Sequence, residues 1–273
     1  MTETHIDSPD DPECHNTRMA WLIHVFTSTG VVAGFLGLLS VFDGSPRAAL
    51  IWFIVAVVID GLDGPMARRY DVGRAIPTID GNTLDLVIDY VTCVVGPVFF
   101  FHEFGLFPDG PISLIMVALI LVSSLYCFAN TNLMTEDHYF NGFPAMWNLV
   151  VAILWVLQSR PWVNVVVTAI FVVLTFLPVQ FIHAFRTRDF RRVTIPLMVV
   201  WLGALLYVIW IIDEKTRDVG CESNCLPVPA EIAQGIIYLG TIWVLGVGVW
   251  RTIHGPARPH LGEELAGHLD HLG

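Results

Sequence analysis

The sequence predicts an all-α protein that crosses a membrane about eight times. Hydrophobic residues make up 55% of its 273 residues and charged residues only 14%, and the mean hydropathy is +0.65. Soluble domains typically carry about 25% charged residues. The apolar residues gather in segments of the length that a helix needs to cross a hydrocarbon core, about 20 residues for about 30 Å. We therefore expect a polytopic membrane protein.

Eight such segments follow one another along the chain. We place them at residues 19–42, 48–69, 82–101, 111–130, 143–158, 162–184, 193–212 and 231–250. The fifth is short, and residues 143–184 could instead form one long, bent hairpin that is interrupted at Ser159-Arg160-Pro161. Residues 1–18 and 251–273 are expected to be polar tails on either side of one transmembrane domain, residues 19–250.

The basic residues predict that both tails face the cytoplasm. With the N-terminus inside, ten of the 14 Lys and Arg residues fall on the cytoplasmic side, which is the side where membrane proteins concentrate positive charge. An even number of spans agrees with this orientation. The net charge of −11 argues against nucleic acid as a partner and against a polybasic lipid-binding surface.

Four aspartates lie inside otherwise apolar segments, at Asp60, Asp63, Asp85 and Asp89. Carboxylates are costly in a bilayer and are generally kept for function. The first two are three residues apart and the last two are four apart, so each pair shares one face of its helix. A turn at residues 69–81 would make the two helices antiparallel. The four carboxylates are then expected to meet in a cavity open to the cytoplasm.

The four carboxylates predict bound divalent cations, because cations relieve the repulsion among negative charges held close together. Magnesium, manganese and calcium prefer oxygen ligands. Gly64 and Ala67 leave helix surface bare for a bulky ligand, Pro65 is expected to kink the helix, and Arg68 suits phosphate oxygens. Together these residues predict a site for metal ions, a diphosphate and a nucleotide. A cation or proton relay in a transporter is the alternative, although it explains neither the bare surface nor the arginine.

Residues 60–89 match, at every fixed position, the signature D-x-x-D-G-x-x-A-R followed by G-x-x-x-D-x-x-x-D. The chain thus resembles the CDP-alcohol phosphotransferase family. Twelve residues separate Arg68 from Gly81, more than in most of that family. This gap and the eight expected spans resemble the bacterial branch that makes phosphatidylcholine, as do residues 135–140, 142–144 and 147–148.

The resemblance implies an enzyme of the bacterial cytoplasmic membrane that transfers the phosphatidyl group of CDP-diacylglycerol to choline and releases CMP. It implies a divalent cation, Mn²⁺ or Mg²⁺, with two ions per active site, and a homodimer. The metal ligands would be Asp60, Asp63, Asp85 and Asp89, with Asp89 also the base that takes the proton from choline. The nucleotide-binding positions would be Gly64, Ala67, Arg68 and Gly81. Serine, inositol or glycerol phosphate are the acceptors elsewhere in the family, but residues 130–148 offer acids and aromatic rings without Lys or Arg, which favours a cationic acceptor.

Three further groups are candidates for substrate contacts. Aromatic rings bind quaternary ammonium groups, so we assign choline to a group of aromatic and polar residues, some of which could instead be belt residues at the membrane interface: Tyr90, Glu136, Tyr139, Phe140, Trp147 and Asn148. Arg186 and Arg191 could hold the donor's phosphates, although the positive-inside bias alone accounts for most arginines there. Thr29 could line the cytidine pocket or, like its neighbours Thr27 and Ser28, hydrogen-bond a backbone carbonyl.

Overall fold

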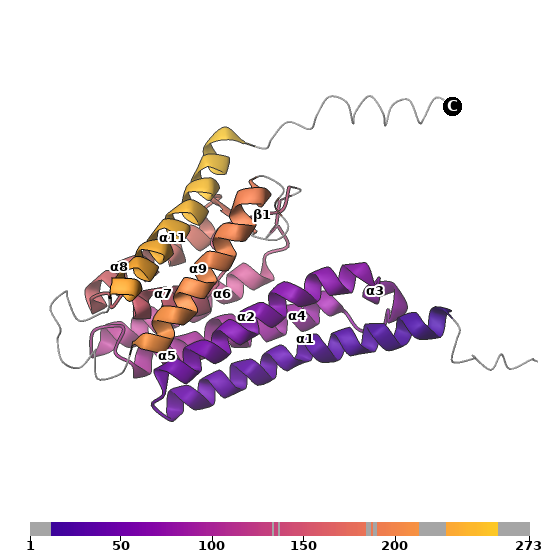
Figure 1. The fold of residues 1–273 in the computed structure, drawn as a ribbon, viewed down its shortest axis with the longest axis horizontal. Coiled ribbons are helices and arrows are strands. Elements are labelled where there is room, and N and C mark those ends of the chain that lie inside the picture. Colours follow the sequence, from indigo (N-terminus) through magenta and orange to yellow (C-terminus); the bar gives the residue numbers. More distant parts are fainter. Residues whose placement is uncertain are drawn as a thin grey trace, which may run out of the picture.

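The computed structural model describes residues 12–132, 134–135, 137–183, 187, 190–212 and 228–255. The first half of the chain is a set of helices packed side by side (Figure 1). They are α1 (Pro12–Phe42), α2 (Pro46–Arg69), the short α3 (Val72–Ala75), α4 (Gly81–Asp89), the π-helical turn η1 (Tyr90–Val95), α5 (Gly96–Glu103) and α6 (Pro111–Ala129). The second half contains β1 (Tyr139–Asn141), α7 (Trp147–Val156), α8 (Pro161–Phe176), β2 (Gln180–Ile182), α9 (Arg191–Ile211) and α11 (Val228–His254).

The prediction of an all-α polytopic membrane protein is confirmed. In the described part of the chain six helices are long and apolar enough to cross a membrane: Thr17–Phe42, Pro46–Arg69, Gly81–Glu103, Pro111–Ala129, Arg191–Ile211 and Val228–His254. The remaining two apolar helices, α7 and α8, have only 10 and 16 residues. They are shorter than the expected segments 143–158 and 162–184. Ala145 has a positive φ of 56° before α7 begins, and Leu177 is extended after α8 because it precedes a proline.

Two of the glycines of α1 allow close contact with the helices beside it. A Cβ atom at Gly34 would lie 2.6 Å from Thr92 Cγ2, and one at Gly37 would lie 2.6 Å from Phe53 Cε1. Both distances are shorter than carbon atoms tolerate, so the helix axes could not lie this close with larger residues. Small residues serve the same purpose in many membrane helix pairs. This close packing places α1 against the helices that carry the aspartates.

One end of the bundle is closed by three side-chain hydrogen bonds between segments far apart in the sequence. Arg47 Nη2 donates to the carbonyl of Ile212 at 3.1 Å. Asn164 Nδ2 donates to the carbonyl of Leu106 at 2.7 Å, and Gln234 Nε2 donates to the carbonyl of Val156 at 2.7 Å. Because α2 begins at this end and α9 finishes there, Arg68 and Arg191 lie toward the opposite end, as the charge distribution predicts.

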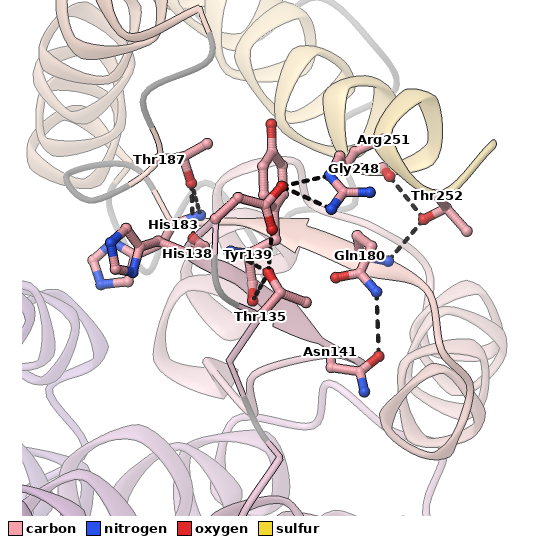
Figure 2. Close-up of polar contacts among 11 residues, drawn as sticks. Thr135, His138, Tyr139, Asn141, Gln180, His183, Thr187, Gly248, Arg251 and Thr252 are labelled. Carbon is pink, nitrogen blue, oxygen red and sulfur yellow. Dashed lines mark hydrogen bonds and ion pairs between the residues drawn. The ribbon is translucent and has the colours of Figure 1, made fainter. Parts of the chain in front are cut away.

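A two-stranded antiparallel sheet lies near the start of α9 (Figure 1), with Tyr139 opposite Ile182. No pattern in the sequence predicts this sheet. The sheet contacts α11 closely: the backbone N–H of Gln180 donates to Thr252 Oγ1 at 2.8 Å, and a Cβ atom at Gly248 would collide with the carbonyl of Gln180. Figure 2 shows these residues together, and they attach the end of α11 to the sheet.

Candidate active site

The four aspartates line one small cavity. It has a volume of about 10 Å³, which is room for about one water molecule or ion. Its lining comes from four elements: Thr27 and Gly30 of α1, Ala56, Ile59, Asp60 and Asp63 of α2, Asp85, Ile88 and Asp89 of α4, and Thr92 of η1. The predicted meeting of two antiparallel helices therefore occurs, and α1 supplies a third wall.

Three of these carboxylates are close enough to share an ion. One oxygen from each of Asp60, Asp85 and Asp89 lies within 4.8 Å of the other two, and Asp63 is buried beside them with 6% of its surface exposed. Two like charges 4 Å apart repel by about 4 kcal/mol at an effective dielectric constant of about 20. A divalent cation reverses the sign of this interaction, and the all-oxygen donor set suits a hard cation. The residues present therefore fit a metal site.

The start of α4 is held in place beside the aspartates. Asp80 caps the helix: its carboxylate accepts hydrogen bonds from the Asn82 N–H at 3.0 Å and from Thr83 Oγ1 at 2.6 Å. The bond from Thr83, followed by the bonds from the backbone, lowers the pKa of Asp80. The connection from α2 is fixed by a small apolar cluster of Ala20, Ile23, Val72 and Ile76, against which Ala67 packs. The predicted nucleotide positions Ala67 and Gly81 therefore belong to an ordered corner.

Gly64, Pro65 and Arg68 lie on the same helix as Asp60. Gly64 is half-buried, whereas Pro65 and Arg68 are exposed. Helix α2 continues through Pro65 to Arg69, so Asp60 and Arg68 remain on one helix.

The polar residues nearest to Asp89 extend the site into the interior. Cys93, one turn further along, has its Sγ 4.0 Å from Asp89 Oδ1. The side chain of Asn148 on α7 is 1% exposed, and its Nδ2 donates to Cys93 Sγ at 3.2 Å. Asn148 therefore lies behind Asp89, separated from it by one thiol. No sequence pattern connects these three residues.

The predicted choline residues are spread over several places. Tyr90 directs its hydroxyl to the carbonyl of Leu121 at 3.3 Å, and Phe140 stacks on His183 with ring centres 5.2 Å apart. Trp147 is fully buried, and its Nε1 donates to Ser124 Oγ at 2.8 Å, so it packs in the core instead of at an interface. Glu136 lies outside the described residues.

Tyr139 is also fully buried, and it already has a cation beside it. The guanidinium of Arg251 lies over its ring and forms an ion pair with Asp137 at 2.7 Å. Figure 2 shows Arg251 and Tyr139 between the sheet and α11. The aromatic ring and the carboxylate of this segment thus hold a cation of the chain itself.

The remaining two groups of candidates are placed as follows. Thr29 Oγ1 donates to the carbonyl of Phe26 at 2.6 Å and is exposed, whereas Thr27 lines the aspartate cavity. Arg191 lines an open pocket of about 660 Å³ with Phe190, Arg192, Ile195 and Pro196. Arg186 lies outside the described residues.

Comparison with known proteins places these features in a family. A family model described as CDP-alcohol phosphatidyltransferase matches residues 20–179, a range that includes all four aspartates and β1. The phosphatidylcholine synthase of Pseudomonas aeruginosa is 38% identical over 239 residues, which cover 87% of this chain and 93% of that protein. The phosphatidylcholine synthase of Borreliella burgdorferi is 35% identical over 199 residues, covering 73% and 84%. That of Bradyrhizobium diazoefficiens is 37% identical over 190 residues, covering 70% and 71%.

Proposed function

Since this chain belongs to the CDP-alcohol phosphatidyltransferase family, we propose that it is a phosphatidylcholine synthase, which transfers the phosphatidyl group of CDP-diacylglycerol to choline and releases CMP. The observation that carries this proposal is the meeting of Asp60, Asp85 and Asp89 from two helices around one cavity. Relatives named phosphatidylcholine synthase that cover most of the chain support choline as the acceptor.

The metal ligands in this proposal are Asp60, Asp63, Asp85 and Asp89. All four carboxylates line the cavity, which has room for about one ion between them, and the family resemblance supports a second ion beside the first. Both would be Mn²⁺ or Mg²⁺. When bound, such ions neutralise the negative charge that grows on the diphosphate as the bond to CMP breaks.

Asp89 is the proposed general base. It accepts the proton of the choline hydroxyl while the hydroxyl oxygen bonds to the lipid-side phosphorus and the bond from that phosphorus to CMP breaks. A positioned base of this kind contributes about 10²- to 10⁴-fold to the rate. Because the displacement is direct, no covalent enzyme intermediate forms and the configuration at phosphorus inverts.

The nucleotide is assigned to the surface formed by Gly64, Ala67 and Gly81, with Arg68 beside the phosphates. Thr27 replaces Thr29 as the threonine of α1 closest to this site, since it lines the aspartate cavity. Arg191, at the start of α9, is the proposed contact for the donor's phosphates. Its open pocket combines two arginines with apolar side chains, a combination that suits a lipid headgroup.

Choline must reach Asp89 to react, so the residues that bind it are expected to lie close to Asp89. Of the residues assigned to it from the sequence, Tyr90 follows Asp89 directly and Asn148 is connected to it through Cys93. These two residues support an acceptor site on the η1 side of the aspartates.

The chain is a multi-pass membrane protein, and we propose the bacterial cytoplasmic membrane with both termini in the cytoplasm. The gathering of basic residues toward the end that contains Arg68 and Arg191 supports this orientation. The family resemblance supports a homodimer, which cross-linking in native membranes would detect.

Incorporation of radiolabelled choline into lipid tests the proposed function. The purified protein should form labelled phosphatidylcholine and an equal amount of CMP only when CDP-diacylglycerol and Mn²⁺ or Mg²⁺ are both present. Asp89→Asn should lower kcat by about 10²- to 10⁴-fold, whereas Asp80→Asn, which changes the exposed cap of the same helix, should not. Transfer to serine, inositol or glycerol phosphate in place of choline would change the acceptor. Ion flux into proteoliposomes without CMP release would instead select a transporter.

A further inference from the structure

We propose that His24 of α1 binds the cytidine nucleotide through its Nε2 atom. This inference rests on the proposed function and adds a residue to the nucleotide site that neither the family signature nor the spacing of the aspartates contains.

The first observation is a buried polar atom without a partner. The side chain of His24 is 7% exposed, and its Nε2 has no hydrogen-bond partner among the described residues. Most buried polar atoms in native proteins are hydrogen-bonded, and leaving one unpaired costs the desolvation of that atom. A buried imidazole nitrogen in this condition is therefore expected to meet a group that joins it from outside the chain.

The second observation is where that nitrogen lies. Cε1, the ring atom bonded to Nε2, is 3.7 Å from the position that a Cβ atom would take at Gly81. Gly81 is exposed at the start of α4, where the missing side chain leaves space. Thr27, three residues further along α1 and on the same helix face, lines the aspartate cavity. His24 thus lies between the aspartate cavity and the bare start of α4.

The surroundings hold the ring in this position. Trp21 packs against it at 6.4 Å between ring centres, edge to face, and Ala20 and Ile23, which precede it on α1, belong to the apolar cluster with Val72 and Ile76. The nearby hydroxyl of Ser28 donates to the His24 carbonyl, at 2.8 Å, and not to the ring.

A nucleotide offers the chemistry that this nitrogen lacks. A ribose hydroxyl both donates and accepts hydrogen bonds, so it can pair with Nε2 in either tautomer of the neutral ring. The metal ions are assigned to the four carboxylates, which leaves His24 to the nucleoside part of the donor.

Kinetics of two His24 variants test the inference. His24→Phe keeps the ring volume but removes Nε2, and His24→Gln places an amide near the position of that atom. His24→Phe should raise the KM for CDP-diacylglycerol about tenfold, because one hydrogen bond is lost. Its kcat and its KM for choline should stay within about twofold of the wild type. His24→Gln should recover part of the lost affinity. Thr168→Val is the matched control, because Thr168 Oγ1 is also buried and has no partner in the described part of the chain, but it lies on α8.

The outcomes separate this inference from the proposed function. If the wild type makes phosphatidylcholine and folded His24→Phe keeps the wild-type KM for CDP-diacylglycerol, the inference is wrong and the function stands. If the wild type makes none, calorimetric titration with CMP and Mn²⁺ tests the inference without the reaction. Weaker CMP binding by folded His24→Phe than by the wild type supports it, and equal binding overturns it. Should neither variant fold, the structure of the wild type with CMP decides. A polar nucleotide atom within about 3.5 Å of Nε2 supports the assignment, and a nucleotide bound elsewhere overturns it.

Discussion

The guanidinium carbon of Arg251 lies 5.3 Å from the centre of the Tyr139 ring. The same guanidinium donates through Nε at 2.8 Å and Nη2 at 2.7 Å to one oxygen of Asp137, while the other oxygen accepts from Thr135 Oγ1 at 2.7 Å. An aromatic ring beside a carboxylate is the arrangement that the sequence suggests for choline. Here it binds an internal cation, which indicates that this segment attaches α11 to the sheet.

The ion pair predicts an asymmetry between its two single variants. The side chain of Arg251 is 7% exposed and that of Asp137 is 32% exposed. Asp137→Asn leaves a buried guanidinium without a counter-charge and should cost about 3 kcal/mol. Arg251→Met keeps an apolar stem and leaves a partly solvated carboxylate, and should cost about 1 kcal/mol. Thermal unfolding in detergent micelles measures both, with Asp109→Asn in an exposed loop as the control. Equal losses in the two variants would contradict this account.

The pH dependence of this pair follows from the direction of its shift. Partial burial acts to raise the pKa of Asp137, but the hydrogen bonds from Thr135 and Arg251 and the positive charge of Arg251 outweigh it, and the pKa falls below the ordinary value of 3.8. A carboxyl with a depressed folded pKa stabilises the fold above its unfolded pKa and loses that contribution as the pH falls through its folded pKa. The difference in unfolding temperature between the wild type and Asp137→Asn should therefore stay constant from about pH 8 to about pH 5 and shrink only below 3.8. A difference that already shrinks near neutral pH would argue against this origin.

The close contact between Gly34 and Thr92 predicts that a substitution at residue 92 can restore a protein that is destabilised by a larger residue at 34. Gly34→Ala places a methyl group 2.6 Å from Thr92 Cγ2, and Thr92 lines the aspartate cavity. Overpacking of this kind typically costs about 1–3 kcal/mol, and it should also lower activity because the wall of the cavity moves. Thr92→Ser removes Cγ2 and leaves Cα and Cβ of residue 92 at 3.5 Å, an ordinary contact.

The double variant Gly34→Ala/Thr92→Ser should therefore recover most of the lost stability and activity. Gly203→Ala is the control, since no described residue outside the adjoining turns of α9 comes within 4 Å of a Cβ placed there. Measurements are the unfolding temperature and choline incorporation. A double variant no better than Gly34→Ala would exclude the Thr92 contact as the cause.

Substitution of two aspartates near the same end of the bundle distinguishes direct metal coordination from the effect of negative charge in general. Asp60→Asn removes one of the three clustered carboxylates and should weaken Mn²⁺ binding by at least about tenfold, measured by titration of the purified protein. Asp80→Asn should leave Mn²⁺ affinity and stability unchanged, because asparagine caps helices as well as aspartate does. Chelation of the metal should abolish choline incorporation, and added Mn²⁺ or Mg²⁺ should restore it. Equal weakening in both variants would assign the effect to long-range charge.

The aspartate cluster could be predicted from the sequence because each pair is set by spacing within a single helix. Features that depend on distant partners could not. The strands of the sheet have three residues each, too few to show a period of two, and Arg251 pairs with a residue 114 positions away. Thr27 and Thr29 are two residues apart on α1, about 200° around the helix. Only the position of the neighbouring helices decides which of them faces the aspartates.

The π-helical turn η1 fixes the rotational phase between two halves of one long helix. Gly96 N–H donates to the carbonyl of Val91, five residues back, so this turn contains one residue more than a regular α-turn. If the same residues were wound uniformly as an α-helix, everything beyond them would be rotated by about 100° relative to the preceding turns. The buried aromatic side chains of Phe100 and Phe101 would then swing away from the interior while the carboxylates stayed in place. The one extra residue in this turn therefore lets the carboxylates face the cavity while the aromatic side chains beyond it remain in the core.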